Sequence, residues 1–161
     1  AYQSFGVVPD VMSTAKGIAG GVPCGLMMAK ENVAKAFAPG DHASTFGGNP
    51  LATAAGNVVV DELLGGLLDN VKEQGAYLRE QLEKVAEKHK DLVKDVRGMG
   101  LMQGIELNKP AGPVVAKAID LGLLLVGAGQ FIIRFVPSLI VSKADIDTAM
   151  EILDKALESA E

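Results

Sequence analysis

The chain has 161 residues, which is the usual size of one domain and enough to bury a core. Its composition, 48% hydrophobic and 22% charged, is ordinary for a soluble globular protein, and its net charge of −5 argues against a nucleic-acid-binding surface. The single cysteine, Cys24, excludes an internal disulfide and fits a reducing compartment.

The sequence shows no targeting segment and no stretch that we expect to span a bilayer. A basic N-terminal region followed by an apolar run is absent. These features predict a cytoplasmic protein without a membrane partner. The chain begins with Ala1, in the middle of what reads as a continuous fold, which predicts a truncated or proteolysed product.

The first 50 residues are rich in glycine and apolar side chains. We expect short strands at Val11–Thr14 and Gly25–Ala29, followed by a short helix within residues 31–37. Strands this short and apolar usually lie inside a larger sheet that is covered on both faces. The chain has too few of them to build such a sheet, so we expect further strands to come from elsewhere.

A long helix is predicted from Asn49-Pro50, because Asn is a good N-cap and Pro suits the first helical position. It runs to about Leu64, where Gly65-Gly66 interrupts it, and a second helix with one apolar stripe continues to about Lys90. We place a domain boundary at this interruption, which gives one domain over residues 1–64 and another over 65–161.

The second domain reads as an α/β layer of strands covered by helices. The predicted elements are strands at Val93–Val96 and Leu101–Leu107, a helix at Pro113–Leu121, strands at Leu123–Val126 and Phe131–Phe135, and a final helix. Ser142 and Asp145 form a capping box for this last helix. Met27, Met28, Met99 and Met102 are interpreted as core filler.

Lys16 lies where the first apolar strand gives way to a glycine-rich turn. No carboxylate occurs within five residues on either side, so a partly desolvated amine there would have a lowered pKa and act as a nucleophile. A Schiff-base lysine needs these properties. Gly17, Gly20 and Gly21 are expected to take positive φ. The alternative is a solvated lysine on a glycine-rich loop.

Residues 40–50, G-D-H-A-S-T-F-G-G-N-P, suit an anion, since glycines precede a helix N-terminus with free N–H groups. On the residues alone, Ser44, Thr45 and Asn49 could equally cap that helix. Arg134 interrupts an apolar run, and a buried guanidinium there should have a carboxylate partner. The alternative is an arginine on an edge strand that points to water. Arg97 is interpreted as structural.

Together, A-K-G-I-A-G-G-V-P-C-G and G-D-H-A-S-T-F-G-G-N-P resemble the class III, fold-type I aminotransferases, which use pyridoxal 5'-phosphate (PLP). V-R-G-M-G-L-M and I-R-F-V-P extend the resemblance over nearly all of the chain, which corresponds to the C-terminal part of such an enzyme. It implies that residues 1–64 form the end of the large PLP-binding domain with the start of a linking helix, and that 65–161 form the small α/β domain.

The resemblance also implies roles for individual residues. Lys16 would form the Schiff base with PLP and move a proton, and Thr45 would contact the cofactor phosphate, typically from the neighbouring subunit. Ser44 matches a position that contacts substrate, and Arg134 one that pairs with a substrate carboxylate or a protein glutamate. The implied partners are an amino acid, a 2-oxo acid and a second copy of the chain in a homodimer with shared active sites.

Other cofactor contacts of the family lie upstream of Ala1: a second phosphate-binding loop, a stacking aromatic residue and an aspartate at the pyridine nitrogen. We therefore predict that this chain alone is inactive and holds PLP poorly or not at all. Three other readings stay open. They are a class III enzyme with a different amine substrate, a non-catalytic self-associating module, and a Schiff-base enzyme that uses no PLP.

Overall fold

A computed structural model describes residues 1–159, and these divide into two compact units, residues 1–65 and the described residues from 66 onward. Both mix helices with strands, so the predicted α/β class is confirmed.

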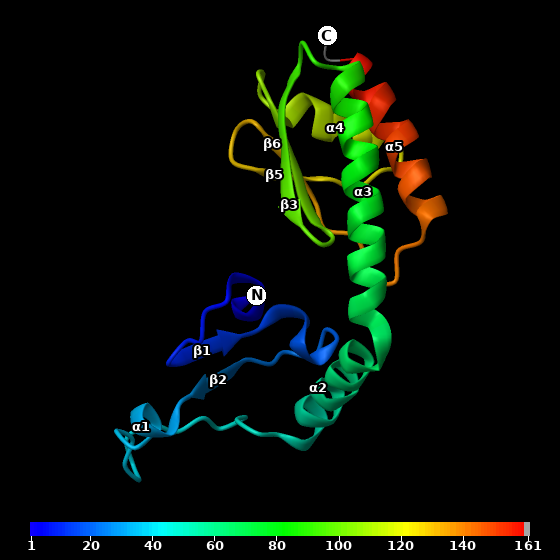
Figure 1. The fold of residues 1–161 in the computed structure, drawn as a ribbon. Helices are drawn as coiled ribbons and strands as arrows, with labels where there is room; N and C mark the ends of the chain where they lie inside the picture. The colour runs from blue at the N-terminus through cyan, green and yellow to red at the C-terminus, as the bar shows by residue number, and fades with distance from the viewer. Residues whose placement is uncertain (160–161) are drawn as a thin grey trace. The chain divides into compact units, whose positions relative to one another are not determined.

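The first unit contains a two-stranded antiparallel sheet and two helices. Strand β1 (Val11–Thr14) pairs with β2 (Leu26–Ala29), so that Val11 lies opposite Ala29 and Thr14 opposite Leu26 (Figure 1). Helix α1 (Glu31–Ala34) follows β2, and α2 (Pro50–Glu62) ends the unit. The predicted strands and helices of this region are thus confirmed, with α1 shorter than expected.

Few apolar side chains of the first unit are buried. Ala19 and Ala52 are 1% and 3% exposed, whereas Met27 and Met28 on β2 are 58% and 42% exposed. The interpretation of these two methionines as core filler is therefore wrong for the described chain. A two-stranded sheet has too little surface to bury both of its faces, and no third strand pairs with it among residues 1–65.

The helical run is interrupted at Gly65-Gly66, as the sequence predicted. A single π-helical turn, Leu63–Leu67, joins α2 to α3 (Leu68–Lys88), and only Gly66 leaves helical geometry, with φ of 126°. By length and composition, the run Pro50–Lys88 could cross a membrane. The sequence predicted no such stretch, and this one meets the criterion only when α2 and α3 are counted as one run across the non-helical Gly66.

The second unit is a four-stranded antiparallel sheet with helices α3, α4 (Gly112–Asp120) and α5 (Lys143–Glu158) on one face (Figure 1). The strand order is β3-β4-β6-β5, and these strands span Val93–Met99, Met102–Leu107, Ile132–Phe135 and Val126–Ala128 respectively. The predicted strand at Leu123–Val126 is displaced, because the paired segment begins only at Val126.

The core of the second unit lies between the sheet and these helices. Leu78 and Leu82 of α3 and Leu153 of α5 are almost fully buried against Ile105 of β4 and Ile133 of β6. The capping box that opens α5 is confirmed, since Ser142 Oγ accepts from the Asp145 N–H while the Asp145 carboxylate accepts from the Ser142 N–H. Burial of one stripe of α5 and one face of the sheet stabilises this unit.

No helix of the described residues 66–159 covers the other face of this sheet, which we call the open face. Met99 and Met102 lie on it and are 55% and 63% exposed, so the prediction that they fill the core is also wrong. Side chains alternate along a strand, and the face of each methionine follows from the register of β3 and β4.

Candidate functional site

Lys16 is the one non-glycine residue among residues 1–159 with positive φ, at 60°. It lies two residues after Thr14, the last residue of β1, and begins the 3₁₀ turn Lys16–Ala19. The left-handed conformation costs an L-residue about 1–2 kcal/mol. Gly20 and Gly21 have positive φ as predicted, but Gly17 does not, and the unusual conformation is taken by Lys16 itself.

Close packing against α2 holds this turn in place. Ala19 is buried, and a Cβ added to Gly56 of α2 would lie 3.5 Å from the Ile18 carbonyl oxygen. A Cβ on Gly20 would likewise lie 3.5 Å from Cγ2 of Val59. Small residues on both sides therefore let the turn approach the helix, and this packing fixes the backbone that carries Lys16.

The Lys16 side chain is exposed, and no ion pair joins it to any of the described residues. The expectation of a partly desolvated amine is therefore wrong for residues 1–159 taken alone. Burial of a lysine requires chain packed over it, and no described segment covers this position. What the structure offers here is an accessible primary amine on a fixed backbone.

The loop before α2 leaves two hydroxyl groups without hydrogen bonds. Asn49 is the helix cap, because its Oδ1 accepts from the Ala52 N–H at 2.9 Å while its Nδ2 donates to the Phe46 carbonyl at 3.0 Å. Within residues 1–159 the hydroxyls of Ser44 and Thr45 have no hydrogen-bond partner. Of the three residues that could have capped the helix, only Asn49 does so.

Glycines shape this loop. Gly48 takes φ of 67°, and a Cβ on Gly47 would lie 3.1 Å from Cβ of Ser44, which is too close for an ordinary contact. The tight backbone keeps Ser44 and Thr45 exposed just ahead of the α2 N-terminus. Lys16 and this loop are thus both attached to α2, but no hydrogen bond in the described chain joins Lys16 to Ser44 or Thr45.

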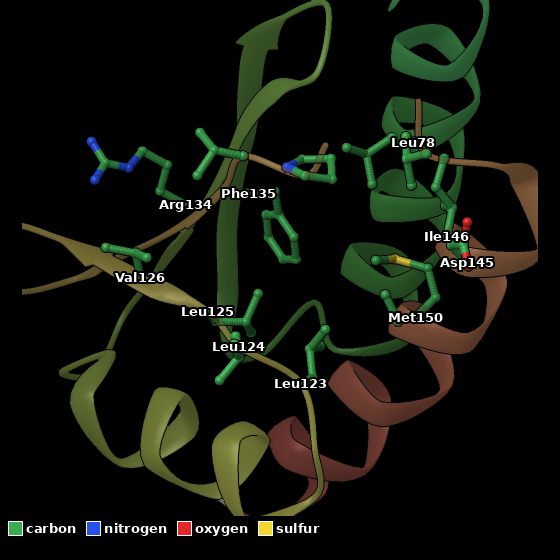
Figure 2. A pocket seen from close by; sticks show the side chains of 14 residues that line it. Leu78, Leu123, Leu124, Leu125, Val126, Arg134, Phe135, Asp145, Ile146 and Met150 are labelled. Carbon is green, nitrogen blue, oxygen red and sulfur yellow. The ribbon is translucent and has the colours of Figure 1, made fainter. Parts of the chain in front are cut away.

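Arg134 lies on β6, which is an interior strand between β4 and β5. Its neighbours Ile133 and Phe135 face the helices and are buried, whereas Arg134 points to the open face and is exposed. Figure 2 shows its side chain extending away from Phe135 and Leu125. Arg134 has no ion pair among residues 1–159. The predicted burial with a carboxylate is therefore wrong for the described residues. The alternative was right that the side chain is exposed but wrong that its strand is at the sheet edge.

An apolar cavity of about 230 Å³, which the sequence did not predict, lies on the helix side of β6 (Figure 2). Leu78, Phe135, Ile146 and Met150 are among the side chains that line it. Asp145 also lines it, but this carboxylate is held by Ser142, and hydrogen bonds from the Ser142 hydroxyl and N–H lower the pKa of Asp145. Arg134, which has no ion pair in the described chain, is the other charged residue of the lining, and its guanidinium extends away from Phe135.

A charged cluster on the open face was also not predicted from the sequence. Arg97 of β3 donates from Nη1 to Asp95 at 2.5 Å and from Nη2 to Glu106 of β4 at 2.7 Å. These hydrogen bonds, the one to Asp95 foremost, raise the pKa of Arg97 above its usual value. The alternation of Asp95, Arg97 and Glu106 with apolar residues was the sequence signal that could have placed all three on one face.

Comparison with known proteins gives one consistent result. The family model described as aminotransferase class-III matches residues 1–157. The acetylornithine aminotransferase of Caldanaerobacter subterraneus is 51% identical over 158 residues, which cover 97% of this chain and 40% of that protein. The chain thus spans about 40% of the length of this curated relative.

Solved structures agree with the family match. The acetylornithine aminotransferase of Elizabethkingia anophelis is 30% identical, with a TM-score of 0.89 over 99% of this chain and 41% of that one. The ornithine delta-aminotransferase of Plasmodium falciparum is also 30% identical, with a TM-score of 0.87 over 98% of this chain and 42% of that one.

Proposed function

The chain belongs to the class III aminotransferases, and from this membership we propose that the complete protein transfers an amino group from N-acetylornithine to 2-oxoglutarate in arginine biosynthesis. Support for the substrate comes from the 51% identity to an acetylornithine aminotransferase. Because the chain spans only about 40% of that relative, the activity belongs to the complete polypeptide.

We assign residues 1–64 to the C-terminal part of the large PLP-binding domain, with the start of the linking helix, and residues 65–161 to the small domain. The separate compact units and the similarity to solved aminotransferases support this division. The proposed enzyme is a cytoplasmic homodimer with shared active sites and has no nucleic-acid or membrane partner. The net charge of −5 supports the lack of a nucleic-acid partner.

Class III aminotransferases are PLP-dependent, and the groups present on this chain fit that cofactor. Lys16 is an accessible amine without an ion pair in the described chain, which suits an aldehyde carbon. The unpartnered hydroxyls of Ser44 and Thr45, ahead of a helix N-terminus, suit a phosphate and a polar substrate group. Lys16 would hold the aldehyde carbon, Thr45 the phosphate of a neighbouring subunit's cofactor, and Ser44 the substrate.

Bound PLP supplies an electron sink for the negative charge that develops on the amine-bearing carbon of the substrate. The residues of this chain position the reactants and move the proton. Lys16 Nζ would take the proton from that carbon and so act as general base. Arg134 orients the substrate by binding a carboxylate, for which its unpaired guanidinium on the open face is suited.

The observation that carries this proposal is the left-handed backbone of Lys16. Strain of this kind persists where the surrounding structure holds it, and it gathers at functional sites. It falls here on the lysine that the family resemblance makes catalytic. An ordinary surface lysine would have no reason to take a conformation that glycine adopts freely.

The test is an assay of the complete polypeptide with PLP, N-acetylornithine and 2-oxoglutarate, in which glutamate formation is measured. We expect turnover in the wild type and a loss of at least about 100-fold in Lys16→Ala, since general base catalysis alone contributes about that much. Lys35→Ala is the matched control, because Lys35 is an exposed lysine that pairs with Glu31. Equal activity of the Lys16 and Lys35 variants would contradict the proposal.

A second candidate is a class III enzyme with another amine substrate. The solved ornithine delta-aminotransferase is as similar in sequence as the solved acetylornithine enzyme, at 30% identity each, which favours keeping ornithine as an alternative. The same assay with ornithine, succinylornithine, 4-aminobutyrate and glutamate-1-semialdehyde decides between them. A kcat/KM for any of these above that for N-acetylornithine would replace the proposed donor.

A further inference from the structure

Arg97 and Arg134 lie in one cross-strand row on the open face of the sheet. Both are paired in register with Gly104 of β4, Arg97 from β3 and Arg134 from β6. Neighbouring strands are about 4.8 Å apart, so the two arginine backbones are about 10 Å apart. Directly paired residues point to the same face, and Gly104 places no side chain between the two guanidinium groups.

The two arginines are in different electrostatic states. Arg97 is held by two carboxylates, those of Asp95 and Glu106. Arg134 is exposed and has no ion pair among residues 1–159. One guanidinium of the row is thus neutralised by the protein, and the other is left available.

Glu106 is the carboxylate of the open face that could neutralise Arg134. It is paired in register with Ile132, two residues before Arg134 on β6. Such diagonal neighbours on one face are about 7–8 Å apart, within reach of long side chains. Asp95 lies one strand further away. Asp145 lies across Phe135 from the Arg134 guanidinium and is held by Ser142 (Figure 2).

We propose that Arg97 is a positioning residue that holds Glu106 and so keeps Arg134 free for the substrate carboxylate. This inference rests on the proposed function, in which Arg134 binds that carboxylate. Without the Arg97 cation, Glu106 would pair with Arg134, and each incoming substrate would have to break that pair. Arg97 itself touches no reacting atom, so its loss weakens substrate binding and leaves the chemical step intact.

The test is steady-state kinetics on the complete polypeptide with variants of the row. Arg97→Gln is expected to raise KM for 2-oxoglutarate about fivefold, the effect of one exposed ion pair that competes with the substrate. Its kcat is expected to stay within about twofold of the wild type, because the interaction lost is ground-state binding. The double variant Arg97→Gln/Glu106→Gln is expected to restore KM, since the carboxylate diagonal to Arg134 is then removed and Asp95 lies one strand further away.

Two single variants serve as controls. Lys at position 97 keeps a cation beside Glu106, and Gln at position 106 removes the competing carboxylate, so Arg97→Lys and Glu106→Gln should both keep a KM near that of the wild type. A raised KM in Arg97→Gln that Glu106→Gln does not restore would overturn the inference, because it would show that Arg97 acts through the fold. A fall in kcat without a change in KM would overturn it as well.

Arg134→Gln distinguishes the positioning role of Arg97 from the proposed substrate role of Arg134. Suppose that Arg134→Gln raises KM strongly, but that adding Glu106→Gln to Arg97→Gln does not bring KM back to the wild-type value. That result overturns the inference about Arg97 and leaves the proposed substrate role of Arg134 in place. An unchanged KM in Arg134→Gln overturns that substrate role, and the inference that rests on it falls too.

Discussion

Gly75 of α3 lies directly against Gly100 in the turn between β3 and β4. A Cβ placed on Gly75 would stand 2.5 Å from the carbonyl carbon of Gly100, closer than real contacts allow. The contact joins the longest helix of the second unit to the hairpin that carries Arg97 and Glu106. Helix and hairpin can therefore keep this spacing only while position 75 lacks a side chain.

Gly75→Ala should destabilise the protein by about 1–3 kcal/mol, the usual cost of overpacking, even though alanine favours helix by about 1 kcal/mol. Gly65→Ala is the matched control, because a Cβ at Gly65 meets nothing within 4 Å. Urea unfolding of both variants in the complete polypeptide measures the difference. A Gly75 variant as stable as the Gly65 variant would show that the helix can move away from the turn.

The second unit buries two glutamines, and only one is satisfied. Gln103 donates to the Gly100 carbonyl at 2.7 Å and accepts from Arg79 at 3.0 Å, whereas Oε1 of Gln74 has no partner among the described residues. Gln103→Met should cost about 1–3 kcal/mol, and Gln74→Met should be neutral or stabilising. Thermal unfolding of the two variants tests this, and an equal loss in both would refute the distinction.

Because of Asp154 on α5, the folded protein should lose stability in acid. Burial raises the pKa of this carboxyl, but hydrogen bonds from Lys88 and His89 lower it more, so the net pKa lies below its usual value. A lowered folded-state pKa gives stability that is fully present above the unfolded value of about 3.9. That stability is lost as the pH falls through the folded-state value.

Asp154→Asn should therefore lower the unfolding free energy at pH 7 by about 1–3 kcal/mol and flatten its decline below about pH 4. Unfolding curves at pH 7 and pH 3 measure both effects. Asp120→Asn, at an exposed aspartate of α4, is the control and should match the wild type at pH 7. If the unfolding free energy of Asp154→Asn declined in acid as steeply as that of the wild type, the assignment would be contradicted.

The left-handed backbone at Lys16 should lower stability, while the Lys16 amine should be needed for activity. Both Lys16→Gly and Lys16→Ala remove the amine, but only glycine accepts φ of 60° without strain. We expect Lys16→Gly to be more stable than Lys16→Ala by about 1 kcal/mol, with both inactive. Denaturation of the two variants side by side isolates the backbone effect from the loss of the side chain. Equal stability would show that the backbone relaxes.

The chain by itself should not hold PLP firmly. Lys16 is exposed in the described residues, so little protein surface is available to surround a ring bound there. Adding PLP to the purified 161-residue chain should give at most a weak yellow absorbance band, which Lys16→Ala removes, and no glutamate should form with both substrates present. Steady turnover by this chain would refute the prediction.

Local features of the sequence were enough to predict most elements and the family. Asn49 caps α2, and Ser142 with Asp145 opens α5 as expected. These predictions succeed because caps and periodic apolar stripes depend on residues only a few positions apart. The motif around Lys16 identified the class III aminotransferases by the same local pattern, whereas the assigned roles of Lys16, Ser44, Thr45 and Arg134 remain predictions.

Tertiary structure alone decided which of these residues are covered and which are paired. Arg134 was expected to be buried, but its apolar neighbours face the helices and it faces the open side of the sheet. Met27 and Met102 are exposed for the related reason that no described segment covers their faces. The ion pair of Arg97 with Glu106 depends on the register of β3 and β4. Register is set by contacts between parts of the chain that are distant in sequence, which no short stretch contains.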